Sequence, residues 1–361
     1  MAPSPFPYHG PLEPAQVQGR DELVSDLIER VGSRRVTALL GPRRYGKTSV
    51  LRRVAAELTG TTTVWVDLYE VTSMPDVAVR FDDALAATTG RFARAARHVS
   101  AGLALNLGAV KVELTGPARS RPDADLTFHR LLDVLVATAA EEPTLLVVDE
   151  FSSIARVKGA AGALRTAVQH HYRELGIVFA GSHPSMMRTL FTSRAEPFYG
   201  QADLVEIGAL DAAAVSGIVG SGFAATGRDA GHVAGLIASF TAGHPQRTMQ
   251  LADACWRHTP PGGTAGPTTW SAALDEVRRS TAEGMERLYS GFERGERSVL
   301  RAVARGGSIY GAEAGLLELS TGTATHARRA LLDSGDLVDT DAGLRVVDPL
   351  LADWLRERFP I

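Results

Sequence analysis

The chain has 361 residues, of which 45% are hydrophobic, and this length and composition suit two or three domains with apolar cores. Lys and Arg together number 38 against 41 Asp and Glu, a balance that excludes a strong overall field attracting nucleic acid or an anionic membrane. The single cysteine, Cys255, excludes an internal disulfide framework, and no apolar run approaches the roughly 20 residues needed to cross a bilayer. The N-terminus lacks the basic and apolar segments of a secretory signal, so we expect a cytoplasmic protein with no membrane partner.

The first predicted elements lead up to a glycine-rich loop. Prolines recur as far as Pro14, so this opening segment cannot form a helix, and we expect it to lie extended over a folded surface. Apolar residues recur at helical spacing from Leu23 to Val31, which predicts a helix within residues 18–31. The apolar, partly β-branched run 35–40 then predicts a buried strand.

Residues 41–49 fit the pattern G-x-x-x-x-G-K-[ST] and lie between that strand and a helical pattern over 50–58. In this context the glycines let backbone N–H groups turn toward phosphate oxygens, and the helix N-terminus adds partial positive charge. We expect Lys47 to reach the β- and γ-phosphates of a nucleotide and Thr48 to ligate Mg²⁺. A chance glycine turn before a helix is the alternative. The residues expected to contact the nucleotide here are Gly41, Pro42, Arg43, Arg44, Tyr45, Gly46, Lys47, Thr48 and Ser49.

Further strands and helices follow this loop. The β-branched run 61–67 indicates a second strand. Helical patterns cover residues 76–89, 126–140 and 160–172. Between the first two of these helices the sequence alternates with period two, which predicts a β-hairpin inserted into the domain at about 101–116.

A second motif lies in residues 144–151, where a continuous apolar run ends in the adjacent carboxylates Asp149 and Glu150. Such a run is typical of a parallel strand buried on both faces, and ligands of parallel sheets bind beyond the carboxyl ends of the strands. We therefore expect Asp149 to lie beside the phosphate loop and to hold Mg²⁺ through its water shell. Glu150 would orient and deprotonate the water that attacks the γ-phosphate. A merely polar strand end is the alternative.

Two more strands complete the predicted sheet. Residues 176–183 form another buried run with small and polar residues at its end, where Ser182 or His183 would sense the γ-phosphate through a hydrogen bond. Residues 204–208 form the last strand. Five strands, mostly parallel and separated by helices, predict a doubly wound α/β core over residues 1–210.

The strand pattern ends after residue 210, and helical patterns interrupted by Gly and Pro continue to about residue 290. We expect this segment, 211–290, to form a helical lid. From 291 to 361, three helical patterns are followed by two short apolar runs that are separated by a turn. Three helices and a hairpin predict a winged-helix domain.

These segments resemble the prokaryotic archaeal-type ATPases, a branch of the AAA+-related and STAND-like signal-transduction P-loop ATPases, over most of the chain. The phosphate loop with its paired arginines, the Asp149-Glu150-Phe151 segment and the ending Val347–Trp354 are each similar to motifs of that family. The resemblance implies an α/β P-loop NTPase fold of the ASCE or AAA+ type, with five strands followed by a lid and a winged helix. It also implies ATP and Mg²⁺ as ligands.

The same resemblance assigns further site residues. Ser182 takes the role of the first sensor, and Gln18 and Gly19 belong to the box whose backbone lies against the adenine. His244 and Pro245 belong to the lid motif that closes on the base.

The sequence departs from the family after Phe198-Tyr199-Gly200. Many relatives carry an arginine at the next position, as a finger acting on a neighbouring subunit or as a relay, whereas this chain has Gln201. A neutral amide cannot stabilise transition-state charge as a guanidinium does, so we expect slow hydrolysis. Arg188 and Arg194 are the nearby residues that would substitute for it.

The favoured function is an ATP-driven conformational switch, regulatory or signal-transducing, with ATP and ADP as ligands and a protein partner or self-association as its output. The alternative is a DNA-binding protein in which ATP gates the winged helix, with Arg328 and Arg329 facing a groove. From residue 293 onward nine basic residues stand against eleven acidic ones, a net charge of about minus two that does not favour DNA. Phosphoryl transfer to a small molecule is a third class, but no segment resembles an acceptor pocket, and Glu150 favours water as the nucleophile.

Overall fold

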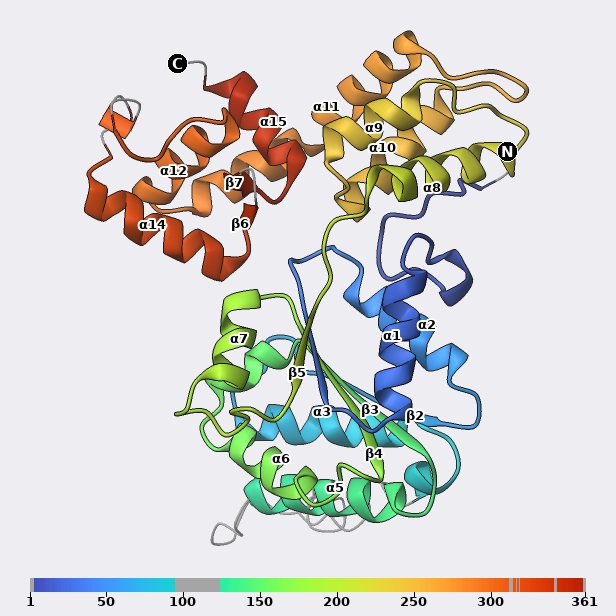
Figure 1. The fold of residues 1–361 in the computed structure, drawn as a ribbon, viewed down its shortest axis with the longest axis vertical. Helices are drawn as coiled ribbons and strands as arrows, with labels where there is room; N and C mark the ends of the chain where they lie inside the picture. The colour runs from blue at the N-terminus through green and yellow to red at the C-terminus, as the bar shows by residue number, and fades with distance from the viewer. Residues whose placement is uncertain are drawn as a thin grey trace, which may run out of the picture.

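The structure is a computed structural model that describes residues 3–94, 124–311, 314–315, 317, 319–340 and 343–359. The hairpin predicted at about 101–116 lies outside these residues, and the second helical pattern of the C-terminal segment, near residue 315, lies partly outside them. Figure 1 shows a part that contains the sheet and a second, mainly helical part. The two are joined by the chain after residue 206 and by the N-terminal segment.

Five strands form one parallel sheet in the order β2-β3-β4-β1-β5, which confirms the predicted α/β fold class. β3 and β4 are buried along their whole length, as their continuous apolar runs indicate. Because β4 lies between β1 and β3, the chain segments that follow these three strands meet at one edge of the sheet. The strands are β1 (Thr37–Leu40), β2 (Thr62–Asp67), β3 (Thr144–Asp149), β4 (Leu175–Gly181) and β5 (Asp203–Glu206).

Helices cover both faces of the sheet. The neighbours Leu39 and Leu40 illustrate the two layers, because Leu39 packs in the core under α1 and α2, and Leu40 packs in the core under α3, α5, α6 and α7. α6 ends four residues earlier than predicted, because the chain turns back to enter β4. The helices are α1 (Asp21–Gly32), α2 (Lys47–Glu57), α3 (Met74–Ala86), α5 (Ala124–Ala139), α6 (Ala160–Val168) and α7 (Pro184–Thr192), with 3-10 turns η1 (Pro14–Gln16) and η2 (Phe151–Arg156).

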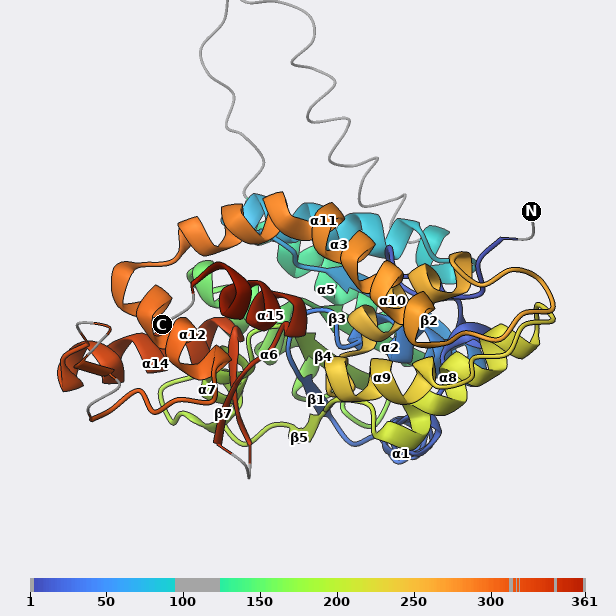
Figure 2. The ribbon, with the colours of Figure 1, turned by 90° about the horizontal axis from the view of Figure 1, so that it is seen from above.

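The second part has one hydrophobic core, whose buried side chains run from Val215 in α8 to Leu355 in α15. α11 is 25 residues long, contacts α9, α10 and α15 (Figure 2), and ends at Gly291, within one residue of the predicted boundary. The division into a lid and a winged-helix domain stays a prediction. The elements are α8 (Ala212–Ala224), α9 (Val233–Thr241), α10 (Pro245–Arg257), α11 (Pro267–Gly291), α12 (Arg294–Ala304), α14 (Thr321–Ser334), β6 (Leu337–Thr340), β7 (Gly343–Val346) and α15 (Pro349–Arg358).

The C-terminal elements include one helix that was not predicted. β6 and β7 pair in antiparallel fashion, as the two apolar runs predicted. α15 follows directly, with Pro349 in its first turn and the Asp348 carboxylate accepting a hydrogen bond from Leu350 N at 3.0 Å. An acidic N-cap followed by proline is a helix start signal. Within the described ranges, every helix is too short or too polar to span a lipid bilayer.

Candidate functional site

The loop between β1 and α2 contains glycine at two places where a side chain would not fit. A Cβ on Gly41 would lie 2.4 Å from Ile207 Cγ2 and 2.7 Å from Ile207 O, because the chain after β5 passes close behind the loop. Gly46 is the N-cap of α2 and has a φ of +87°, a left-handed conformation that favours glycine. α2 therefore begins at Lys47, three residues before the predicted helix, and the free N–H groups of its first turn point toward the loop.

The Lys47 side chain is only 6% exposed and lies inside the loop. Its Nζ donates to Gly41 O at 2.7 Å and to Pro42 O at 2.8 Å. Burial lowers the pKa of this ammonium to about 8, although the carboxylates of Glu150 and Asp149 act in the opposite direction. An ammonium held by neutral carbonyl oxygens is a strong hydrogen-bond donor for an anion that enters the loop.

Thr48 at the start of α2 lies in contact with Asp149 at the end of β3. Thr48 Oγ1 donates to Asp149 Oδ2 at 2.9 Å, and Glu150 N donates to Asp149 Oδ1 at 3.0 Å. Asp149 is 6% exposed, and burial raises the pKa of its carboxyl. A hydroxyl and a carboxylate fit Mg²⁺, which takes oxygen ligands and completes its shell with water and phosphate. Among the described residues, no group of three or more His, Cys, Asp or Glu side chains is placed to hold a metal ion.

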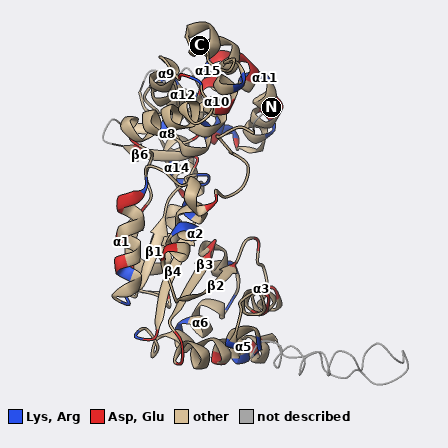
Figure 3. Ribbon diagram, turned by 90° about the vertical axis from the view of Figure 1, so that its right-hand side faces the viewer, with Lys and Arg blue, Asp and Glu red and all other residues tan. Residues whose placement is uncertain are grey.

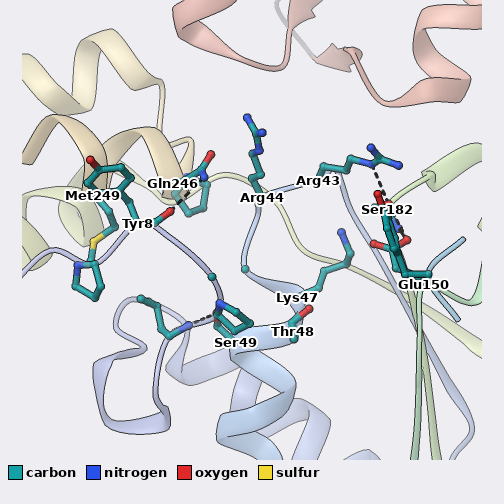
Figure 4. A pocket seen from close by; sticks show the side chains of 17 residues that line it. Tyr8, Arg43, Arg44, Lys47, Thr48, Ser49, Glu150, Ser182, Gln246 and Met249 are labelled. Carbon is teal, nitrogen blue, oxygen red and sulfur yellow. Dashed lines mark hydrogen bonds between the residues drawn. The ribbon is translucent and has the colours of Figure 1, made fainter. Parts of the chain in front are cut away.

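Glu150 follows β3 in a left-handed conformation, with φ at 49°, and its carboxylate turns toward the end of β4. Glu150 Oε2 accepts from Ser182 Oγ at 2.8 Å and from Ser182 N at 3.3 Å (Figure 4). The loop reaches the same place, because Arg43 Nε donates to Ser182 Oγ at 3.4 Å. His183 Nδ1 lies 3.5 Å from Ser182 Oγ, and burial lowers the pKa of its ring. Of the two predicted sensors, Ser182 is therefore the one bonded to Glu150.

These groups surround one end of a cavity of about 430 Å³ (Figure 4). The phosphate loop, Glu150 and Ser182 line that end, and α10 lines the cavity with Pro245, Gln246 and Met249. The remaining wall belongs to Tyr69 and to the N-terminal segment within residues 7–12. A smaller hollow of about 60 Å³ is bordered by Gln18 and Tyr45 and shares Ser49, Pro245 and Met249 with the larger cavity.

Known proteins resemble this chain in structure and not in sequence. No protein-family model and no curated protein matches it. The Walker-type ATPase PABY2304 of Pyrococcus abyssi is similar over 98% of this chain and 99% of its own, with a TM-score of 0.71 and 17% identity. The Aeropyrum pernix ORC2 protein, in ADPNP-ADP complexes, is similar over 98% and 95%, with a TM-score of 0.55 and 15% identity. The Aeropyrum pernix ORC1 protein in complex with DNA is similar over 94% of this chain and 93% of its own, with a TM-score of 0.51 and 13% identity.

The chain has the P-loop NTPase fold. The five-stranded sheet and the following helices both take part in this similarity, since the alignments cover nearly the whole chain. In this fold the loop after β1 and the residues after β3 and β4 form one crevice, which is where Lys47, Asp149 and Ser182 lie.

Of the residues that the family resemblance assigns to the base, Gln18 and Pro245 border one or both of these two cavities, whereas Gly19 and His244 border neither. Gly19 has a φ of +66°, and a Cβ on it would lie 2.8 Å from Ala214 Cβ, so it allows α8 to approach. Gln18 borders the smaller hollow, and its Oε1 accepts from Ser221 Oγ at 3.1 Å. His244 is buried behind Tyr45, with ring centroids 5.0 Å apart, and burial lowers the pKa of His244 to about 4. Pro245 borders both cavities.

Two charged residues close to the loop, Arg247 and Asp348, were not among the predicted site residues. Arg247 on α10 is 5% exposed and binds the Asp348 carboxylate at 3.0 Å through Nε and at 2.5 Å through Nη2. Arg44 in the phosphate loop places Nη1 3.9 Å from the same carboxylate. Burial raises the pKa of Asp348, but the hydrogen bonds and charge of Arg247 outweigh it, so the pKa is lowered. An arginine two residues after the lid proline and an aspartate before the α15 proline were the available sequence signals.

Proposed function

We propose that this chain binds ATP with Mg²⁺ and hydrolyses it slowly to ADP and phosphate, as a regulatory conformational switch. The observation that carries the proposal is the meeting of Lys47, Thr48 and Glu150 at one end of the cavity, with Asp149 hydrogen-bonded to Thr48 beside it. An ammonium for the phosphates, two oxygen ligands for a metal and a carboxylate for water are the parts that phosphoryl transfer to water requires. The similar ORC2 protein binds ADPNP and ADP, which supports an adenine nucleotide as the ligand.

In the proposed reaction, Glu150 accepts a proton from water while the water oxygen bonds to the γ-phosphorus. The bond from that phosphorus to the β,γ-bridging oxygen breaks, ADP leaves, and the proton then passes from Glu150 to phosphate. Lys47 exchanges the carbonyl oxygens of Gly41 and Pro42 for β- and γ-phosphate oxygens. Mg²⁺, bound by Thr48 and through water by Asp149, would neutralise charge on the same phosphates.

Two features support slow turnover. Ser182 N and Oγ both donate to Glu150 Oε2, so one of the two carboxylate oxygens is already engaged and only Oε1 is open to a water molecule. The predicted finger position holds Gln201, whose Oε1 accepts from Tyr172 OH at 3.4 Å, and Arg188 pairs with Glu206. Neither arrangement brings a guanidinium to the γ-phosphate.

Calorimetric titration with ATP and Mg²⁺ tests the proposal directly. We expect saturable binding near one nucleotide per chain, followed by phosphate release in a separate turnover assay. A protein that gives no heat with ATP, ADP or a nonhydrolysable analogue would refute the proposed function.

The contacts of Asp348 support the switch. Arg247 belongs to the proposed lid (211–290), Asp348 to the proposed winged-helix domain (291–361), and Arg44 to the core (1–210), so one carboxylate joins all three. Bound triphosphate brings negative charge next to Arg44, which lines the same cavity. Phosphate and Asp348 would therefore compete for the same guanidinium, and nucleotide binding would loosen the C-terminal segment from the loop.

Asp348→Asn is expected to raise ATP affinity about fivefold or more, because Arg44 is released to the phosphates. Asparagine keeps the oxygen that accepts from Leu350 N, so α15 retains its N-cap. The matched control is Asp353→Asn, which weakens another buried pair of α15, with Arg278 at 2.8 Å, away from the loop. Both variants should lose thermal stability, and only Asp348→Asn should change the calorimetric dissociation constant. Equal ATP affinities in the two variants would contradict this role of Asp348.

DNA is not the favoured partner, because the α14 arginines face carboxylates of the chain. Arg328 Nη2 lies 2.7 Å from Asp339 Oδ2, and Arg329 Nε lies 3.9 Å from Asp333 Oδ2. Figure 3 shows acidic and basic residues mixed along the C-terminal helices. We expect duplex DNA to show no gel shift at low salt with ATP and Mg²⁺ present, which leaves a protein partner or self-association as the output. A salt-sensitive retarded band would make DNA the partner.

A further inference from the structure

The N-terminal segment connects the helical part to the phosphate loop across the cavity. Its first anchor is Phe6, which is 1% exposed, with its ring centroid 5.8 Å from that of Phe223 in α8. A Cβ on Gly222 would lie 2.4 Å from Phe6 Cζ, so this glycine leaves the space that the ring fills. Phe6 is therefore part of the core of the helical part, although it is far from that part in the sequence.

Two hydrogen bonds hold the rest of the segment. Gln246 Nε2 on α10 donates to Tyr8 O at 3.2 Å, and Leu12 N donates to Ser49 Oγ on α2 at 3.0 Å (Figure 4). The residues of the segment that line the cavity are Pro7, Tyr8, Gly10, Pro11 and Leu12. One wall of the cavity is thus tied to α8, α10 and α2 at once.

The sequence of the segment makes this wall stiff. Pro5, Pro7 and Pro11 each fix φ, and segments rich in proline stay extended without help from hydrogen bonds. Because this segment is stiff and held at both ends, it can move away from the cavity only when one of its ends detaches. The Leu12 end is held by the hydrogen bond from its backbone N–H to Ser49 Oγ and by packing against the apolar core under α2, and the Phe6 end by a fully buried aromatic ring.

We propose that residues 6–12 form a strap that retains the bound nucleotide, and that Phe6 is the positioning residue that fastens it. The inference rests on the proposed function and names a nucleoside di- or triphosphate as the retained ligand. With its phosphates at Lys47, the nucleotide extends past Ser49 toward Leu12 and Met249, which border both cavities. It leaves only after the strap moves, so the strap controls the dissociation rate more than the association rate.

Gly222→Ala tests the strap without changing any residue that lines the large cavity or belongs to the strap. The added methyl group occupies the place of the Phe6 ring tip and displaces it. The matched control is Gly220→Ala in the same helix, where a Cβ meets nothing within 4 Å. Both changes add the same methyl group and the same helix propensity, so a difference between them reports on Phe6.

The measurement is the stopped-flow dissociation of a fluorescent ADP analogue, chased with excess ADP. We expect Gly222→Ala to release it about tenfold faster than the wild type, with a smaller change in association, and Gly220→Ala to match the wild type. Equal dissociation rates in all three proteins, with circular dichroism showing that each one is folded, would overturn the proposal that the strap retains the nucleotide.

Phe6→Ala tests the same contact by removing the ring itself, whereas Gly222→Ala displaces it. It should accelerate release as Gly222→Ala does, and the double variant should be no faster than either single one, because both remove one contact. Additive effects would mean that the two residues act separately and would overturn the inference. A wild-type protein that binds no nucleotide refutes the proposed function itself, whereas binding with unaltered release in both variants refutes the strap alone.

Discussion

Glu150→Gln is expected to bind ATP as tightly as the wild type and to hydrolyse it at least about 100-fold more slowly. The amide has the same shape and still accepts a hydrogen bond from Ser182 Oγ, so the end of β4 keeps its place. It cannot take a proton from water. The loss should therefore fall on the chemical step and leave the calorimetric dissociation constant unchanged.

Single-turnover hydrolysis in the presence of Mg²⁺ measures this effect without interference from product release. Glu141→Gln makes the same substitution at an exposed residue after α5, next to Arg91, and should hydrolyse ATP at the wild-type rate. A Glu150→Gln protein with normal single-turnover kinetics would remove Glu150 from the role of general base.

Lys47→Ala is expected to weaken ATP binding by roughly 100-fold or more, because two charge-assisted hydrogen bonds to phosphate are lost. The substitution also leaves Gly41 O and Pro42 O without their present donor. Isothermal titration should show the loss of binding heat, and thermal unfolding should show that the variant is folded. Wild-type affinity in a folded Lys47→Ala protein would mean that the phosphates bind elsewhere.

The same lysine predicts a dependence of binding on pH. Burial lowers the pKa of Lys47 to about 8, and only the protonated form donates to phosphate with a full charge. Affinity should be constant between about pH 7 and 8, where phosphate groups, with a second pKa of about 6, are already ionised, and should fall toward tenfold per pH unit above pH 8. Lys47→Arg should show no such fall, because a guanidinium stays protonated. A flat wild-type profile between pH 7 and 10 would contradict the lowered pKa.

The strands of the sheet and the proposed phosphate site could be predicted because each is specified by a short, continuous sequence pattern. A strand buried on both faces must be apolar throughout, as in residues 144–149 and 175–181. The loop needs Gly41 for the approach of Ile207 and Gly46 for a left-handed N-cap, so its pattern is visible without a structure. The parallel topology then placed Asp149 near Thr48, although 101 residues separate them.

Contacts between distant segments carried no such signal. Arg247 and Asp348 form a buried pair across 101 residues, and in the sequence nothing distinguishes either one from an ordinary surface charge. The contact of Phe6 with α8 could not be predicted either, because a proline-rich opening indicates only an extended chain and not the helix against which it packs. The contact of the His244 ring with Tyr45 is another example, because a histidine before a proline gives no indication of the ring it will pack against.

The continuous core from α8 to α15 also determines how far a small motion travels. Gly243 lies against the connection after β5, where a Cβ would meet Leu210 O at 1.8 Å, and Leu210 N donates to Gly243 O at 2.9 Å. Because the described buried side chains from α8 to α15 form one continuous apolar core, a rotation at this point would move the helices beyond it as one rigid body. With α11 roughly 37 Å long, a tilt of about ten degrees would displace its distal end by roughly 6 Å, so a small rotation at Gly243 becomes a large displacement at the far end of this helix.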